Sequence, residues 1–489
     1  MYRRAANGAD QGLPRLVRRA VDRQEAVAHY ERGIAEWTEG LQDQALASFE
    51  KALELDAAIA DLPFQEGLER AQAGELSDAE GWLWIAHLFR PEHVPTLACL
   101  GDTLRRLGRV EAALDLLQKG AALDPNSWEV HSDLGLALCE LDRLEGASNA
   151  VERAVELHGL DGRLAVNLAS IRKCEGRVDE ALRLTDEALR MQPDMAAAHV
   201  NRAHLMLLQG RFEEGWREYE WRPRKSLPAA RLLENHQWAG KTVLLHQEQG
   251  AGDLIQFIRF AQALEGAHVT VSCDERFIPV MRCVQSVSDA VSWTEQHAAF
   301  DLEANVMSLP RILNVDFRRF EVPYLSVDPE RAVAWRERLS GERRLRVGLV
   351  WGGNPANPVE RKRGIPPSLL APVLAHPDVA FYSLQQGPQR TELPGVTDLG
   401  SECEAVMEAA AAMMNLDLII TTDTMPAHLA GALGRPVWLL LHSMADWRWM
   451  LGRDDSPWYP GMRLFRQPQP GDWKSVVSRI AEELKIAIR

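Results

Sequence analysis

Three loops carry side chains that could do chemistry, and each follows a short apolar run typical of a buried strand. In "QEQGAGDL", Asp253 closes a glycine-rich turn ahead of an amphipathic stretch. In "VWGGNP", the turn is followed by the basic triplet "RKR" at 361–363. In "TTDTMPAHL", Asp423 and His428 flank the expected start of a helix. A carboxylate that takes a proton and cations that hold an anionic leaving group are what a single-displacement transfer needs.

Other interpretations of these residues remain open. "QGAGDL" lacks the third glycine of a dinucleotide fingerprint and the GK[ST] of a P-loop. Asp253 and Asp423 could be helix caps or turn residues, and His428 could be bonded to a backbone carbonyl. "RKR" could be a solvated run of charge. We expect the tryptophans of "DWRWMLGRDDSPWYP" to serve packing rather than sugar stacking: Trp447, Trp449 and Trp458.

The elements that must position these loops alternate between strands and helices, which predicts parallel sheets. Expected strands lie at 241–247, 267–273, 289–293, 345–350, 379–385, 417–424 and 436–442. Expected helices lie at 254–264, 275–284, 404–416, 426–434 and 471–488. The pattern predicts two Rossmann-like lobes at 223–328 and 345–489, joined by a helical linker at 329–344. In such sheets ligands bind beyond the carboxyl ends of the strands, which is where the three loops lie.

The first half of the chain repeats with a period of 34 residues. Small residues recur in phase at Gly33, Gly67, Gly101, Gly135, Ala169 and Ala203. Turn positions recur at Gly40, Gly74, Gly108, Asp142, Gly176 and Gly210. The period is that of tetratricopeptide repeats, so we expect an α-solenoid of about six helix–turn–helix units at 25–222. A basic flexible arm is expected at 1–24.

The array is expected to bind a peptide or protein segment on its concave face, although it could also be a spacer or an oligomerisation module. Its last unit, "GRFEEGWREYEWR", is aromatic where the earlier units are small. We therefore expect that unit to be a cap or a docking surface for the region that follows.

Composition narrows the function further. The 489 residues carry a net charge of −15, so a general nucleic-acid binder is not expected. No apolar stretch reaches the roughly 18 residues of a membrane helix. The six cysteines are scattered without a CxxC pair, and there is no HxxxH or DxD motif. The pattern favours a cytoplasmic protein with reduced cysteines and no metal site.

Together and in this order, "QGAGD", "VWGGNP…RKRGIP", "TTDTMPAHLAGALGRPVWLLL" and "DWRWMLGRDDSPWYP" resemble a known family. The chain looks like the bacterial tetratricopeptide proteins with a C-terminal, heptosyltransferase-like GT-B glycosyltransferase domain, some of which glycosylate flagellin. The resemblance implies that Asp253 is the catalytic base and that Gln249, Gly250 and Gly252 form the cleft loop. It implies donor contacts at Lys362, Arg363, Arg361, Asp423, Thr424, His428, Gly352, Gly353, Asn354 and Gln385. The chain departs from the family pattern at Gly352 and Gly364, where serine is expected, and at Met425-Pro426.

The resulting expectation is an inverting glycosyltransferase that needs no metal and no cofactor beyond a nucleotide-sugar substrate. The repeats would hold a protein acceptor, possibly flagellin, and the sugar would go to a Ser or Thr hydroxyl. ADP-heptose, a CMP-linked nonulosonic acid and a UDP-hexose stay open as donors. The alternatives are a non-catalytic scaffold with a degenerate domain and an enzyme acting on lipopolysaccharide or another glycan. The geometric requirement is that Asp253 faces 361–363 across one cleft.

Overall fold

The computed structural model describes residues 15–224, 226–227, 232–233, 237–295, 299–355 and 360–487. The chain forms two compact units, Met1–Gly159 and Leu160–Arg489. Residues 1–14 of the predicted arm lie outside the described residues. Helix α1 (Arg15–Thr38) begins within the predicted arm, so residues 15–24 are helical rather than part of an arm.

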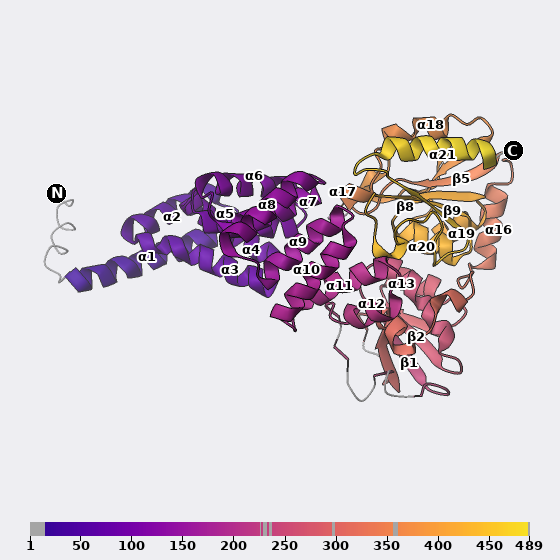
Figure 1. The fold of residues 1–489 in the computed structure, drawn as a ribbon, viewed down its shortest axis with the longest axis horizontal. Coiled ribbons are helices and arrows are strands. Elements are labelled where there is room, and N and C mark those ends of the chain that lie inside the picture. Colours follow the sequence, from indigo (N-terminus) through magenta and orange to yellow (C-terminus); the bar gives the residue numbers. More distant parts are fainter. Residues whose placement is uncertain are drawn as a thin grey trace, which may run out of the picture. The chain divides into compact units, whose positions relative to one another are not determined.

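The first unit consists of antiparallel helix pairs (Figure 1). After α1 come α2 (Gln42–Leu55), a 3₁₀ helix (Ala57–Asp61), α3 (Leu62–Ala73), α4 (Leu76–Phe89), α5 (Val94–Arg106), α6 (Val110–Leu123), α7 (Trp128–Glu140) and α8 (Leu144–His158). Each odd-numbered helix packs on the even-numbered helix that follows it. This is the helix–turn–helix arrangement that the 34-residue period predicts.

The two recurring residue series have distinct physical roles. A Cβ added to Gly135 of α7 would lie 2.3 Å from Val151 Cγ2 of α8, so the paired helices approach too closely for a side chain there. The turn glycines have a positive φ, such as 82° at Gly108, which only glycine adopts without strain. Asp142 occupies the same turn position with φ of 57°, a conformation that Asp tolerates better than most residues.

Two further helix pairs open the second unit: α9 (Gly162–Cys174), α10 (Val178–Met191), α11 (Ala196–Leu208) and α12 (Phe212–Tyr219). They keep the period of the first unit but belong to the same compact unit as the sheets that follow. Trp216 and Tyr219 of α12 lie in one apolar core with Phe257 and Trp447 from the sheet region. The aromatic last repeat is therefore a docking surface, as predicted.

A four-stranded parallel sheet follows, with the strand order β3-β2-β1-β4. Its strands are β1 (Thr242–His246), β2 (His268–Cys273), β3 (Asp289–Ser292) and β4 (Leu302–Asn305), and its helices are α13 (Ala251–Phe257), α14 (Ile278–Met281) and α15 (Leu309–Leu313). Strand β4 was not predicted. Two predicted helices are shorter than expected, because 258–263 and 275–277 are 3₁₀ segments that extend α13 and precede α14.

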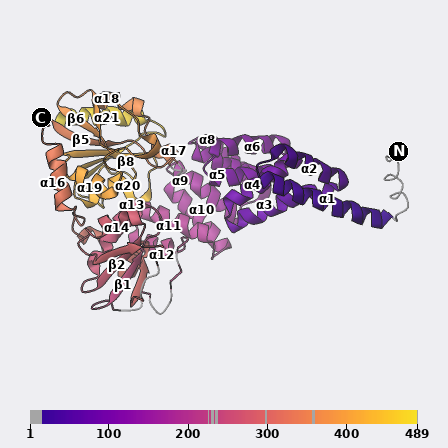
Figure 2. The ribbon, with the colours of Figure 1, turned by 180° about the vertical axis from the view of Figure 1, so that it is seen from behind.

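The second sheet has six parallel strands in the order β10-β9-β8-β5-β6-β7. The strands are β5 (Leu345–Val350), β6 (Val379–Ser383), β7 (Val396–Asp398), β8 (Leu418–Thr422), β9 (Val437–Leu441) and β10 (Met462–Arg466). The helices are α17 (Glu360–Arg363), α18 (Ala371–Leu374), α19 (Val406–Met414), α20 (Met425–Ala432) and α21 (Trp473–Ala487). Figures 1 and 2 show α18 and α21 on one face of this sheet and α19 and α20 on the other. Strands β7 and β10 were not predicted.

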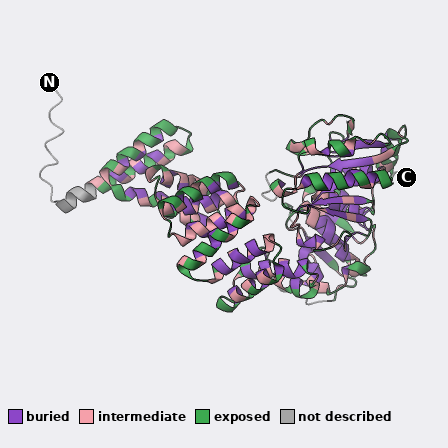
Figure 3. Cartoon of the chain, turned by 45° about the horizontal axis from the view of Figure 1, so that its top comes forward, coloured by how far each residue is buried: buried purple, intermediate pink, exposed green. Residues whose placement is uncertain are grey.

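The predicted linker contains α16 (Pro329–Arg338), which is packed against the second sheet region. Trp335 donates a hydrogen bond from Nε1 to Glu408 of α19 over 2.9 Å, and Asn415 donates to the Ala332 carbonyl over 3.0 Å. The segment is thus a docked helix. Figure 3 shows the strands of both sheets buried and the outer faces of the covering helices exposed.

Candidate functional site

The two halves of the six-stranded sheet diverge between β5 and β8. These strands are parallel neighbours, with Val350 opposite Thr421. From β5 the chain continues through β6 and β7 to one edge of the sheet, and from β8 through β9 and β10 to the other. Such a switch point opens a crevice at the carboxyl ends of the strands, where open parallel sheets bind ligands.

A cavity of about 200 Å³ lies at this switch point. Its sheet side comes from the segments after β5, β8 and β9, and its opposite side comes from the helices α9 and α11. The lining residues are Lys173, Cys174, His204, Leu208, Lys362, Arg363, Asp423, His442, Met444, Ala445, Asp446 and Trp447. The predicted loop residues Lys362, Arg363 and Asp423 are therefore brought together.

Each carboxylate that lines the cavity has an arginine partner. Arg363 lies 3.5 Å from the Asp423 carboxylate and donates to the Asp423 carbonyl over 3.2 Å. Arg448 donates to Asp446 over 2.7 Å. Burial raises the pKa of Asp423 against the opposing charge of Arg363. Although burial acts against it, Arg448 followed by Arg363 lowers the pKa of Asp446 to about 2, so Asp446 is ionised at neutral pH.

Asp253 is not among the residues that line this cavity, and its predicted position facing 361–363 stays a prediction. Its Oδ2 accepts a hydrogen bond of 2.8 Å from the Gly250 N–H at the start of α13, and its Oδ1 pairs with Arg448. Arg448 is nearly buried and also donates to Gln256 over 2.7 Å. Asp253 therefore caps α13 from the N3 position, with Gly250 as the N-cap residue, and its link to the cavity runs through Arg448 to Asp446.

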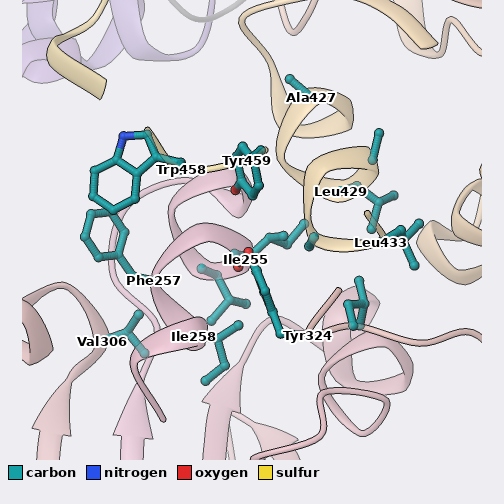
Figure 4. Packing of buried hydrophobic residues seen from close by; sticks show 14 of the residues in the cluster. Ile255, Phe257, Ile258, Val306, Tyr324, Ala427, Leu429, Leu433, Trp458 and Tyr459 are labelled. Carbon is teal, nitrogen blue, oxygen red and sulfur yellow. Dashed lines mark hydrogen bonds between the residues drawn. The ribbon is translucent and has the colours of Figure 1, made fainter. Parts of the chain in front are cut away.

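One end of the cleft loop packs against α20, while Gln249 and Gly250 are exposed. A Cβ at Gly252 would lie 2.8 Å from Cδ2 of His428, so the loop touches that imidazole directly. Below this contact, apolar side chains of α13 and α20 face each other, among them Ile255 and Leu429, and Ile258 begins the 3₁₀ segment that extends α13 (Figure 4). Gln249 accepts a hydrogen bond of 3.2 Å from the Tyr219 hydroxyl and so ties the loop to α12.

His428 is likewise a packing residue. Nδ1 lies 3.1 Å from the Tyr459 hydroxyl, and the ring stacks on Trp449 with centroids 5.5 Å apart. Burial, followed by the charge of Arg448, lowers the pKa of His428 to about 3, so the imidazole is neutral at physiological pH. The sequence left a backbone carbonyl open as a partner, and the structure gives the Tyr459 hydroxyl instead. The contact of His428 with a donor stays a prediction.

Gln385 holds the loop after β5 in place. Its Oε1 accepts hydrogen bonds of 3.0 Å from the backbone N–H groups of Trp351 and Gly352, and its Nε2 donates to Gly352 O and Gln386 O. These four bonds use the whole capacity of an amide side chain. Gln385 therefore has nothing left to offer a ligand and acts as a positioning residue.

The glycines of the same loop are surrounded by protein atoms. A Cβ at Gly352 would lie 1.7 Å from Gln389 Oε1, and a Cβ at Gly353 would lie 2.6 Å from Glu360 Oε2. Glu360 accepts a bond from the Gly353 N–H, and burial raises its pKa. Sequence reasoning missed Glu360, although it directly precedes the basic triplet.

The remaining predicted contacts lie around the cavity. Thr424 is the N-cap residue of α20, and its hydroxyl donates to Thr422 O over 3.3 Å. Arg361 is exposed, and neither it nor Asn354 is among the lining residues. Sequence reasoning also missed the solenoid residues of the cavity and Arg448, which lies inside the noted "DWRWM" motif.

The tryptophans of that motif serve packing, as expected. Trp447, Trp449 and Trp458 are buried, and Trp458 stacks on Phe317 with ring centroids 3.8 Å apart. Within the described ranges, no group of three or more His, Cys, Asp or Glu side chains is arranged to hold a metal ion. No helix in the described part of the chain is long and apolar enough to cross a membrane. The six cysteines, all within the described ranges, form no disulfide bond.

Comparison with known proteins supports the repeats. Tetratricopeptide repeat family models match residues 26–59, 100–171 and 175–219. The chain is 26% identical to Protein FlbA of Caulobacter vibrioides over 454 residues, which covers 82% of this chain and 75% of the relative. It is also 26% identical to BBSome complex member BBS4 of Xenopus tropicalis over 121 residues, 25% of this chain and 23% of that protein.

Among solved structures, the chain is similar to TTC0263, a thermophilic TPR protein of Thermus thermophilus. The identity is 21%, the match covers 37% of this chain and 99% of that chain, and the TM-score is 0.29. The chain thus contains tetratricopeptide repeats at 26–59, 100–171 and 175–219, is similar over most of its length to Protein FlbA, and has two parallel sheets after the repeats.

Proposed function

We propose that the protein is an inverting, metal-independent glycosyltransferase with a GT-B domain. It moves a sugar from a nucleotide-sugar to a Ser or Thr hydroxyl of a protein acceptor bound by the repeats. The observation that carries this proposal is the cavity at the β5–β8 switch point, lined by Lys362 and Arg363. Cations at that place suit the phosphates of a nucleotide, since charge-assisted bonds to phosphate are among the strong ones.

Lys362 and Arg363 would stabilise the charge that develops on the departing nucleotide. Arg363 already pairs with Asp423, so binding a phosphate means sharing that guanidinium between two anions. The N-terminus of α20, where Thr424 is the N-cap residue without a side-chain capping bond, begins next to Asp423 and adds a positive dipole end. The cavity is smaller than the roughly 300–1,000 Å³ typical of ligand pockets, so it matches the phosphate portion of a donor rather than the whole molecule.

The acceptor is proposed from the resemblance to flagellin glycosyltransferases, and flagellin is therefore the first protein to test. The repeats support a protein acceptor over a lipid or polysaccharide, because helix-pair arrays offer extended surfaces for polypeptide.

The non-catalytic scaffold stays a second candidate because of one observation. Asp253, the sequence-based candidate for the base, is already bonded to Arg448 and to the Gly250 N–H. Two of the about four acceptor sites of that carboxylate are therefore taken, and an acceptor hydroxyl would have to reach one of the others. A protein whose sheets only bind partners would have no need of a free base.

Intact-mass measurement of flagellin co-expressed with the full chain tests the activity. We expect a mass increase of one or more sugars with the native chain. Lys362→Ala should lose most of that increase because the leaving group loses a cation. Lys474→Ala removes an exposed lysine of α21 and should behave as the native chain does. An unmodified flagellin in every case, together with no binding of nucleotides, favours the scaffold.

Asp253→Asn separates two roles for this carboxylate. As the base, its loss should abolish transfer while nucleotide affinity and melting temperature stay near those of the native chain. As the partner of Arg448, its loss should lower the melting temperature and weaken nucleotide binding together, because a nearly buried arginine loses one of its carboxylates.

A further inference from the structure

One wall of the switch-point cavity comes from the repeat array. Lys173 and Cys174 end α9, and His204 and Leu208 lie in α11. These helices belong to the last two repeat pairs, which share a compact unit with the sheets. The repeats are therefore part of the cavity itself, in addition to any role in holding an acceptor.

Lys173 differs from its neighbour Arg172 in having no carboxylate partner among the described residues. Arg172 is buried and paired with Glu175 and Glu180 over 3.0 and 2.9 Å. Lys173 is half-buried, and within the part of the chain that the structure describes no carboxylate lies within 4.0 Å of its ammonium. A lysine in the last turn also stabilises the helix dipole, but that role does not require a position facing a cavity.

The positive charge of Lys173 acts on His204, another residue that lines the cavity. Burial, followed by the charge of Lys173, lowers the pKa of His204 to about 4, so this imidazole is neutral at physiological pH. The two carboxylates of the lining, Asp423 and Asp446, are matched by Arg363 and Arg448. Lys173 thus adds a positive charge that the anionic side chains of the lining do not pair with.

We infer that Lys173 is a cationic contact for the phosphate groups of the nucleotide donor, supplied by the repeat array opposite Lys362 and Arg363. The inference rests on the proposed function and deepens it, because it makes the donor site a composite of repeats and sheet. The shared chemistry is a phosphate anion held between lysines on opposite walls. A nucleoside diphosphate offers two such groups and a nucleoside monophosphate offers one.

Calorimetry on the full chain tests the inference with UDP, ADP, GDP, CMP and inorganic pyrophosphate as probes. For the tightest probe, Lys173→Ala should weaken binding about tenfold, in line with charge-assisted bonds to phosphate. Lys173→Arg should restore most of the affinity, and Lys474→Ala should leave it unchanged. Stronger binding of diphosphates than of CMP would indicate that both phosphates are held. Melting temperatures within about 1–2 °C of the native value, roughly a 1 kcal/mol change for a folding unit of this size, show that the variants fold.

The outcomes separate this inference from the function on which it rests. Loss of affinity in both Lys173→Ala and Lys362→Ala supports the composite site. Loss in Lys362→Ala with no change in Lys173→Ala overturns the inference and leaves the proposed function standing. Failure of every probe to bind the native chain overturns both. Should Lys173→Ala fail to fold, Lys173→Met keeps the side-chain length without the charge and gives the same comparison.

Discussion

The repeats of the first and second units share a period of 34 residues. They differ in what they pack against, because the last repeat of the second unit packs on the sheet region. At multiples of 34 residues before Trp216 of α12, the first unit has Leu46, Glu80, Leu114 and Ser148. None of these four is aromatic, and only Leu114 is as buried as Trp216, which is 6% exposed. The residues that recur every 34 positions therefore specify the helix pair. A residue that departs from the repeat, such as Trp216, specifies what that pair packs against.

The largest effect should come from the docking residue itself. Trp216 lies between Phe257 and Trp447, with ring centroids 5.7 and 5.3 Å away. We expect Trp216→Ala to cost about 3–5 kcal/mol, the usual range for a buried Trp or Phe. Urea unfolding followed by region-resolved hydrogen exchange should place the loss in the second unit. Trp221→Ala is the control, because Trp221 is 43% exposed and should cost far less. Equal losses in the two variants contradict the docking role.

The next effect concerns the close approach of paired helices in the first unit. Gly135→Ala should destabilise that unit by roughly 1–3 kcal/mol, because the new methyl group meets Val151 and the Ala147 carbonyl. Gly81→Ala is the matched helical control, since a Cβ there meets nothing within 4 Å. That control should gain up to about 1 kcal/mol from helix propensity. Thermal unfolding of both variants makes the comparison, and a stabilising Gly135→Ala would mean that the helices can move apart at no cost.

A smaller effect is expected at the turns, where the two units differ in one residue type. Gly176→Ala puts a side chain at φ of 79° with open space around it, so the cost is purely conformational, about 1–2 kcal/mol. Asp142→Gly relieves the same strain in the first unit and should change stability by less than about 1 kcal/mol. Denaturation midpoints of the pair are the measurement. A neutral Gly176→Ala would show that the turn adopts another conformation.

The smallest effect near neutral pH should be the pH dependence of stability, which we expect to differ between the two units. The pKa values of His204 and His428 are lowered from 6.5 to about 4 and about 3, respectively. Below pH 6.5 the unfolded chain therefore binds more protons than the folded chain. Stability of the second unit therefore falls as pH drops from 6.5 towards 4. Burial lowers the pKa of His87 and His93 in the first unit as well, by less. Hydrogen exchange corrected for its intrinsic pH dependence reports each unit, and His428→Gln should flatten the response of the second.

Much of the fold is encoded locally and could be predicted. The in-phase glycines indicated the helix pairs, and the turn positions from Gly40 to Gly210 all have a positive φ. The strands missed were β4, β7 and β10. All three lie at the edges of their sheets, and β7 has only three residues, so their pairing depends on neighbours far along the chain.

The site was predicted only on its sheet side. Lys362, Arg363 and Asp423 were named because loops at the carboxyl ends of strands attract ligands. Lys173 and His204 were missed because nothing in a repeat distinguishes a helix face that lines a cavity from one that faces solvent. Asp253 was assigned to the cleft from the family resemblance. Its bond to Arg448 was missed because the two residues lie 195 positions apart and no local sequence pattern predicts that contact.

The position of Gly159 has a consequence for how such a chain can vary. Every residue that lines the cavity follows it, beginning with Lys173. Whole 34-residue units can therefore be inserted or deleted ahead of Gly159, changing the reach of the array for partners of different length, while the sheets keep their own two helix pairs. Repeats after Gly159 cannot be deleted in the same way, because α9 and α11 form one wall of the cavity.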